Sequence, residues 1–226
     1  INRTVRRGGT VIIPAFAVGR AQSLLFHLSQ LRRQKRIPDV PVFLDSPMAV
    51  NATQIFHDHL GEHRLTPEQC NETFAVATFV RQAEDSKKLN TNPMPKIIIS
   101  ASGMATGGRI LHHLKNYAPD RRNTILLAGF QAGGTRGAAL RDGAKEIKIH
   151  GGYVPVHAEV ISLGMFSAHA DSDELMRWLS GFESAPRRVF VTHGEPEGSD
   201  ALRHRIEEEL GWEAMVPEYL QRVELN

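Results

Sequence analysis

Two histidines stand where their side chains could do chemistry. His169 lies in the segment FSAHAD, a turn of small residues between an apolar run and a helical stretch. His193 lies in VTHGEP, where an expected strand ends and a glycine lets the chain turn. A histidine on a loop with rigid flanks is well placed to bind a metal or transfer a proton, because imidazole titrates near neutral pH. A structural role for either histidine is the alternative.

Three glycine-bearing loops follow expected strands and place an arginine where a helix begins. An arginine at a helix start opposes the helix dipole, whereas a bound phosphate would use the free N–H groups found there. We therefore expect anion binding at these loops, with close packing and ordinary turn glycines as the alternative. The residues concerned are Arg20, Ser102, Gly103, Arg109, Thr135 and Arg136.

Other phosphate-binding patterns are absent from the sequence. No glycine-rich loop ends in Gly-Lys-Ser/Thr, and none reads Gly-x-Gly-x-x-Gly, so a nucleotide cofactor is weakly supported. Asp45 precedes Ser46-Pro47, a pattern that favours an Asx turn or a helix cap over a catalytic carboxylate.

The elements that must position these loops alternate along the chain. Apolar runs predict strands at residues 10–16, 40–44, 96–100 and 124–130, with amphipathic helices between them. Continuous apolar strands separated by helices indicate an α/β fold with a mostly parallel sheet covered on both faces. Residues 61–95 are less regular, with a helix expected at about 78–89.

The pattern changes after residue 145. Residues 146–163 alternate in twos around Gly151-Gly152, which predicts a hairpin or a long crossing pair of strands. Beyond it we expect helices at 173–179 and 199–210 and strands at 188–192 and 221–225. The βα repeats end at about residues 155–162, so a domain boundary is expected there.

Composition limits the class of protein. The 226 residues carry a net charge of +2, and 41% are hydrophobic, with no apolar run long enough to span a bilayer. The one cysteine, Cys70, cannot form an internal disulfide, which favours the reducing cytoplasm. No signal segment opens the chain, and a start at Ile1 rather than Met indicates a piece of a longer protein.

Charge is unevenly distributed along the chain. Residues 1–39 carry a net charge of +7 and residues 171–226 a net charge of −7. A basic front and an acidic tail would let a polyanion bind on one side only. Cations at the end of a helix, such as residues 32–36, would equally suit the helix dipole.

Six segments together resemble the β-CASP branch of the metallo-β-lactamase fold, the RNA-processing nucleases. They are GGTVIIPAFAVGRAQSLL, VFLDSPMA, IIISASGMATGGRILHHL, GFQAGGTRGAAL, GMFSAHAD and VFVTHGEP, which occur in the family's order over nearly the whole chain. The chain is most similar to bacterial RNA-specificity exonuclease-like members. The resemblance implies a Rossmann-like β-CASP domain at 1–160 and, at 161–226, a C-terminal βα part of a metallo-β-lactamase αββα domain.

The resemblance also implies roles for particular residues. His193 corresponds to a ligand of one of two catalytic zinc ions, and a histidine there favours RNA over DNA. His169 corresponds to the histidine that contacts the scissile phosphate and helps to protonate the leaving group. Ser167 and Ala168 correspond to a phosphate-holding turn. RNA would then be the partner of the arginine-bearing loops.

One family motif is missing. The main zinc motif, His-x-His-x-Asp-His, does not occur, since His57 and His59 have the spacing but no Asp-His follows. We expect the chain to lack the N-terminal metallo-β-lactamase part, its intramolecular partner, and to be inactive alone. A homodimer is compatible with the resemblance. Two alternatives stay open: a Rossmann-like nucleic-acid or nucleotide binding module without chemistry, and a small-molecule metallo-hydrolase.

Overall fold

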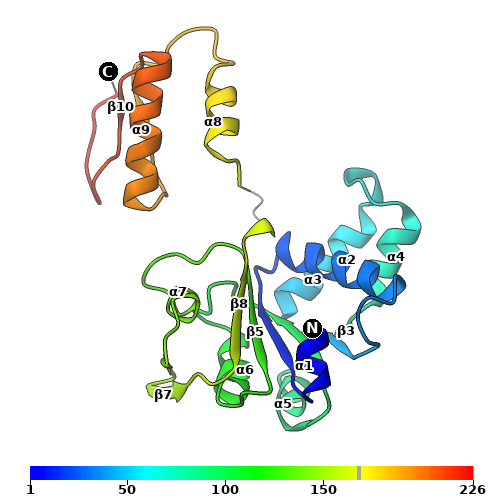
Figure 1. Ribbon diagram of the computed structural model, residues 1–226. Helices are drawn as coiled ribbons and strands as arrows, with labels where there is room; N and C mark the ends of the chain where they lie inside the picture. Colours follow the sequence, from blue (N-terminus) through cyan, green and yellow to red (C-terminus); the bar gives the residue numbers. More distant parts are fainter. Residues whose placement is uncertain (167–168, 226) are drawn as a thin grey trace. The chain divides into compact units, whose positions relative to one another are not determined.

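The computed structural model describes residues 1–166 and 169–225. The chain divides into two compact units, unit 1 (Ile1–Phe166) and unit 2 (Ser167–Asn226). Figure 1 shows their helices and strands. In chain order these are α1 (Asn2–Arg6), β1 (Val11–Pro14), α2 (Arg20–Arg33), β2 (Val42–Leu44), α3 (Pro47–Asp58), the 3-10 helix η1 (Leu60–Glu62), α4 (Pro67–Ala75), β3 (Thr78–Phe79), α5 (Ala83–Thr91), β4 (Ile97–Ser100), α6 (Ile110–Tyr117), β5 (Thr124–Ala128), α7 (Arg136–Arg141), β6 (Glu146–Ile149), β7 (Gly152–Pro155), β8 (Glu159–Leu163), η2 (Gly164–Phe166), α8 (Ser172–Leu179), β9 (Val189–Phe190), α9 (Pro196–Leu210) and β10 (Ala214–Met215).

Unit 1 is built on a parallel sheet. Within residues 1–166, six strands pair in the order β3-β2-β4-β1-β5-β8, all parallel. The central strands are continuous apolar runs, and Ile13 on β1 lies opposite Ile99 on β4. Both residues are almost completely buried. The predicted α/β class with a mostly parallel sheet is therefore confirmed.

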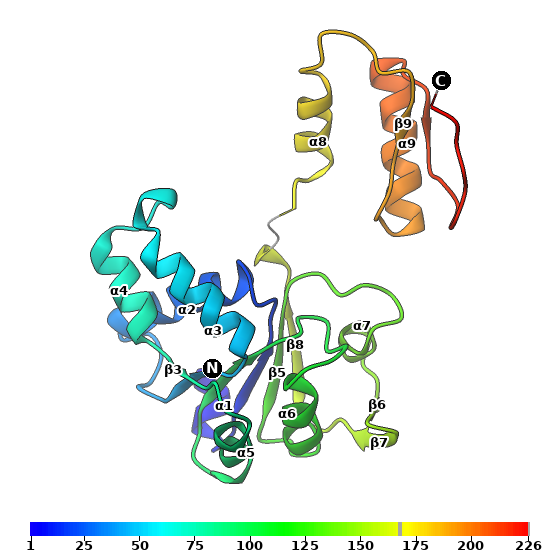
Figure 2. The same ribbon diagram turned by 180° about the vertical axis from the view of Figure 1, so that it is seen from behind.

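Successive residues of β1 lie in two separate hydrophobic cores. Val11 and Ile13 pack with residues of α2 and α3 on one face, while Ile12 packs with residues of α6 and α7 on the other. Figures 1 and 2 show these two pairs of helices on opposite sides of the sheet. A strand covered on both faces has no polar side, which explains its unbroken apolar sequence.

The segment from β6 to β8 contains a hairpin and then an edge strand of the main sheet. β6 and β7 form an antiparallel hairpin that turns at His150-Gly151, which confirms the predicted hairpin. β8 does not continue the hairpin, because it pairs with β5 over its whole length and closes one edge of the main sheet. Unit 1 consequently extends to Phe166.

The less regular region of the sequence contains two helices and a short strand. α4 begins with a capping box, in which Thr66 and Gln69 bond to each other's backbone N–H groups, and Pro67 occupies the first helical position. The helix predicted at about 78–89 is wrong at its start, because Thr78 and Phe79 form β3 and the helix runs over Ala83–Thr91.

Unit 2 is a small βαβ arrangement with an additional helix. Within residues 169–225, β9 and β10 pair in parallel, and α9 connects them. Its core is formed by Met176, Leu179, Val191 and Ile206, with Ala214. The final strand predicted at 221–225 is wrong, since the described strand lies at Ala214–Met215. None of the helices in the described ranges is both long and apolar enough to cross a membrane.

Candidate functional site

The loops singled out in the sequence meet at one edge of the sheet in unit 1. Because all six strands of residues 1–166 are parallel, the segments that follow β1, β2, β4 and β5 leave the sheet at the same, carboxyl, edge. This edge is where open α/β sheets bind ligands. The six predicted residues of unit 1 all lie in these segments or at the helix starts that follow them.

The loop after β4 is bonded to the start of α7. Met104 accepts a hydrogen bond through its carbonyl from the N–H of Gly137 (3.0 Å). Arg136 donates from Nη1 to the carbonyls of Ala105 and Thr106, at 3.3 Å each. The structure therefore brings Ser102, Gly103, Thr135 and Arg136 together, as anion binding requires.

Two hydroxyl groups in this region support the loops themselves. Ser102 Oγ accepts hydrogen bonds from the backbone N–H of Thr106 (3.0 Å) and of Gly107 (3.3 Å). Thr135 caps α7, since its Oγ1 accepts from the N–H of Ala138 at 3.1 Å. Both hydroxyls hold backbone N–H groups in fixed directions.

Two of the glycines are required by close packing. A Cβ on Gly103 would lie 2.8 Å from the ring of Phe16, and a Cβ on Gly137 would lie 1.6 Å from Oε1 of Gln131. Gln131 is itself buried and donates from Nε2 to the Gly103 carbonyl (3.2 Å). The packing explanation that the sequence left open thus accounts for these two glycines.

Arg20 and Arg136 keep their positive charges at this edge. Arg20 donates to the Ala128 carbonyl and lies 5.8 Å from the centre of the Phe166 ring, and burial lowers the pKa of its guanidinium. Arg136 donates to three carbonyls, including that of Lys148. Carbonyls are neutral, and within the described residues neither arginine forms an ion pair. A phosphate near this edge would meet two uncompensated cations.

Arg109 differs from the other two arginines because a carboxylate neutralises it. Its Nη1 lies 2.7 Å from Asp45 Oδ1, and its remaining bonds go to the carbonyls of Val80 and Arg81. This guanidinium therefore joins three segments of unit 1, and its field at the edge is reduced by the neighbouring charge.

Asp45 is the centre of a buried polar cluster that the sequence did not reveal. Its Oδ2 accepts from His113 Nε2 (2.6 Å) and from Ser86 Oγ, and the Asp45 side chain is completely buried. Burial raises the pKa of Asp45, but hydrogen bonds from His113, Ser86 and Arg109 outweigh it and hold the pKa below its usual range. The predicted cap is wrong, since Ser46 caps α3. His113, on α6, is likewise fully buried.

Apart from Arg20, the basic residues of the front of the chain lie at the other edge of the sheet. α1 precedes β1, and α2 ends before β2 begins, so both meet at the amino edge of the parallel strands. There Asn2 Nδ2 donates to the Arg36 carbonyl (2.9 Å), and Arg32 and Arg33 occupy the last turn of α2. Cations in a last helical turn suit the dipole, as the sequence allowed.

His193 lies two residues beyond the end of its strand, in unit 2. It follows β9 by way of Val191 and Thr192, and its φ of 69° falls in the left-handed region that favours glycine. The side chain is exposed, so core packing does not stabilise this conformation. The next residue, Gly194, leaves room only for a hydrogen, because a Cβ there would lie 2.4 Å from Ser199 Oγ.

His169 lies just before α8, also in unit 2, and its side chain is exposed. Asp171 caps that helix with a capping box to Glu174, so the segment entering α8 has a defined direction. Ser167 and Ala168, the other predicted residues of this turn, lie outside the described residues.

Comparison with known proteins places these units in a family. The model described as "Beta-Casp domain" matches residues 21–140, more than half of the chain. The model described as "Zn-dependent metallo-hydrolase RNA specificity domain" matches residues 153–217. The chain belongs to the β-CASP family of metallo-β-lactamase-fold RNA nucleases.

The relatives of this β-CASP chain include a ribonuclease. Ribonuclease TTHA0252 of Thermus thermophilus is 39% identical over 211 residues, which cover 89% of this chain and 47% of the relative. Transcription termination factor FttA of Methanosarcina mazei is 33% identical over 236 residues, covering 100% and 37%. An RNase J-like protein of Methanocaldococcus jannaschii is 34% identical over 205 residues, covering 86% and 45%. The β-CASP chain thus spans less than half the length of each of these relatives.

The β-CASP family is zinc-dependent, and the residues that the structure describes do not form a zinc site by themselves. Within the described residues, no three side chains of His, Cys, Asp or Glu come together as metal ligands. A zinc site needs at least three protein ligands, so the donor set present here does not fit the ion.

Proposed function

We propose that this chain is part of a zinc-dependent ribonuclease that hydrolyses RNA phosphodiester bonds in cytoplasmic RNA processing or decay. The observation that carries the proposal is His193. An exposed histidine occupies a left-handed position that glycine would adopt at lower cost, and it lies inside the match to the RNA specificity domain. Strained conformations of this kind cluster at active sites and ligand-binding turns.

The proposed roles are those that the family resemblance implies. His193 would supply one ligand to one of two zinc ions, and the other ligands would come from outside the described residues. His169 would contact the scissile phosphate and donate a proton to the leaving oxygen. Ser167 and Ala168 would hold that phosphate.

The carboxyl edge of unit 1 would receive the RNA backbone. Arg20 and Arg136 have no carboxylate partner in the described ranges, so each can pair with a phosphate. Gly103 would contribute its backbone N–H. Ser102 and Thr135 would hold the loop backbone in place, because their own N–H groups already donate to the carbonyls of Gly107 and Ala132. Arg109 would act mainly by holding the loop in place, because its charge is already balanced by Asp45.

The donor set predicts that the chain alone does not cleave RNA. The direct test places residues 21–217 of this chain in the corresponding part of Thermus thermophilus ribonuclease TTHA0252, its 39% identical relative. We expect the chimera to cleave single-stranded RNA with zinc, and His193→Ala to abolish cleavage with RNA binding retained. Full cleavage by the His193→Ala chimera, or cleavage by the isolated chain, would overturn the assignment.

A further inference from the structure

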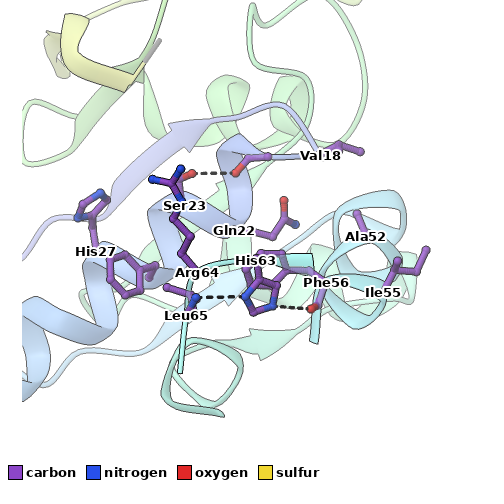
Figure 3. A pocket seen from close by; sticks show the side chains of 12 residues that line it. Val18, Gln22, Ser23, His27, Ala52, Ile55, Phe56, His63, Arg64 and Leu65 are labelled. Atoms are coloured by element: carbon purple, nitrogen blue, oxygen red, sulfur yellow. Dashed lines mark hydrogen bonds between the residues drawn. The ribbon is translucent and has the colours of Figure 1, made fainter. Parts of the chain in front are cut away.

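A cavity of unit 1 lies beside the first of the arginine-bearing loops. It has a volume of about 560 Å³ and lies between α2, α3 and the segment that leads to α4. Figure 3 shows the side chains around it. Val18 and Gly19 belong both to its wall and to the loop after β1. A chain of RNA that follows the carboxyl edge of the sheet would therefore reach this cavity.

An aromatic pair forms one wall. The rings of Phe56 and His63 are stacked, with centres 4.1 Å apart and planes inclined by 15°. His63 is fixed in place, because Nε2 donates to the Phe56 carbonyl (3.1 Å) and Nδ1 accepts from the N–H of Leu65 (3.3 Å). These two bonds fix the orientation of the ring. Phe26 adds a second aromatic surface.

The polar groups of the wall offer acceptors for a flat polar ligand. Gln22 uses Nε2 to donate to the Ala17 carbonyl (3.1 Å) and to Thr53 Oγ1 (2.8 Å). Both amide hydrogens are thereby used, which leaves Oε1 for a ligand. Ser23 Oγ donates to the Gly19 carbonyl (3.0 Å) and keeps its lone pairs. Two acceptors beside aromatic faces match the edge of a base that carries an amino group.

The charge of the wall points to an anionic ligand. Among the described residues that line the cavity none is Asp or Glu, whereas the cation Arg64 is present. Arg64 is exposed, and the described part of the chain contains no ion pair for it. An apolar peptide would need no cation here, but a nucleotide needs one for its phosphate.

We propose that this cavity binds one unpaired base of single-stranded RNA. The base stacks in the aromatic wall, its amino group donates to Gln22 or Ser23, and the adjoining phosphate pairs with Arg64. The volume lies in the range of small-ligand sites. The inference rests on the proposed function only in taking RNA as the ligand, because binding at this cavity needs neither zinc nor the histidines of unit 2.

The first test separates recognition of the base from attraction of the phosphates. Binding of the intact chain to labelled hexaadenylate, and to an abasic strand of the same length, is measured by fluorescence anisotropy without zinc. Since stacking on an aromatic ring contributes substantially per base, Phe56→Leu should weaken hexaadenylate binding about tenfold and leave the abasic strand unchanged. Equal affinities of the two strands for the unaltered chain would overturn the proposal.

The second test uses an exposed position, so that folding is not in question. Ile55 lines the cavity and is 61% exposed. A negative charge at this rim repels phosphate and a positive charge attracts it, so Ile55→Glu should weaken hexaadenylate binding and Ile55→Lys should strengthen it. Arg64→Gln should weaken it about threefold, in keeping with the loss of one phosphate contact.

A control identifies effects of charge alone. Arg121→Gln removes another exposed arginine of unit 1, outside the cavity, and should change binding less than Arg64→Gln. Equal effects of the two arginine variants would show a general electrostatic field instead of a base site. Failure of the ribonuclease assignment would be seen separately, as RNA cleavage by the His193→Ala chimera.

Discussion

His113 and Asp45 share a hydrogen bond of 2.6 Å between Nε2 and Oδ2, and both side chains are completely buried. The two residues come from α6 and from the end of β2, so the bond fixes a helix to the edge of the sheet. Nδ1 of the same ring lies 2.8 Å from Asn90 Oδ1, near the end of α5. One histidine thus joins three elements beside the loop that carries Arg109.

Removing the charge of Asp45 should destabilise unit 1 strongly. Asp45→Asn keeps the shape but leaves Arg109 and His113 without their carboxylate, and breaking a buried pair in this way costs about 3 kcal/mol or more. Urea denaturation followed by far-UV circular dichroism measures the loss. Asp120→Asn is the matched control, because its pair with Arg122 is exposed to solvent and contributes little to stability. Equal effects of the two variants would contradict the structural role of Asp45.

Lys96 should make the stability of unit 1 rise with pH. Its side chain is almost fully buried, and burial lowers its pKa from 10.5 to about 8. Between these values the unfolded chain holds a proton that the folded chain has released, so the free energy of unfolding increases as the pH rises. Below pH 8 both states are protonated and the contribution is constant.

The measurement is a series of urea denaturations of the chain between pH 7.5 and about 9.5. This window lies below the usual pKa of Tyr117, whose phenol burial raises to about 12. Burial also raises the pKa of the Cys70 thiol, which makes the free energy of unfolding fall with pH in this window, so the effect of Lys96 is read from the difference between the unaltered chain and the Lys96→Met chain. Lys96→Met should remove most of the increase. Lys115→Met, at an exposed position on α6, should leave it unchanged. An increase of equal size in the Lys96→Met chain would assign the effect to another group.

The sheet could be predicted from the sequence, because its strands are apolar runs long enough to show. The cluster around Asp45 could not, since His113 follows 68 positions later in the chain and only the fold brings the two together. β3 is two residues long and depends on pairing with β2, so it is too short to give a recognisable alternation of apolar and polar residues. The capping box of Thr66 and Gln69, in contrast, was a local signal from which α4 could have been found.

The location of the candidate site could be predicted from the sequence, but the contacts of its side chains could not. Parallel strands dictate that their following loops meet, which is why Gly103 and Arg136 were expected at one edge. Whether an arginine is free to bind phosphate depends on what else it touches. Arg109 has a carboxylate within 2.7 Å and Arg136 has carbonyls, a difference that no spacing in the sequence encodes.

That difference predicts unequal effects on the salt dependence of RNA binding. Arg136→Gln should reduce the slope of log K against log salt by about 0.7, the value for one lost phosphate contact with a single strand. Arg136→Lys keeps the charge and should keep the slope. Arg109→Lys should leave the slope unchanged and lower the stability of unit 1. Anisotropy titrations of a labelled oligonucleotide at several salt concentrations measure these slopes. An unchanged slope for Arg136→Gln would show that Arg136 does not contact the RNA backbone.

The backbone at His193 should be more stable with glycine than with alanine. Both variants lose the imidazole, but only glycine adopts a φ of 69° without a steric cost, which is about 1 kcal/mol for other residues. Trp178 and Trp212, the two tryptophans of the chain, both lie in unit 2, so fluorescence-detected denaturation reports on this unit. We expect the His193→Gly chain to be more stable than the His193→Ala chain. Neither substitution should allow cleavage in the chimera. Equal stabilities would show that the turn relaxes without cost.

The turn after His193 should depend on Gly194 through one contact. A Cβ at this position would lie 2.4 Å from Oγ of the buried Ser199, so Gly194→Ala should destabilise unit 2 by about 1–3 kcal/mol. Ser199→Ala removes that oxygen, and the double variant should therefore lose much less than the two single losses added together. Gly198→Ala is the matched control in the first turn of α9, where a Cβ meets nothing within 4 Å and alanine favours the helix. It should be neutral or stabilising in the same tryptophan-detected denaturation. Additive losses in the double variant would show that another contact requires the glycine.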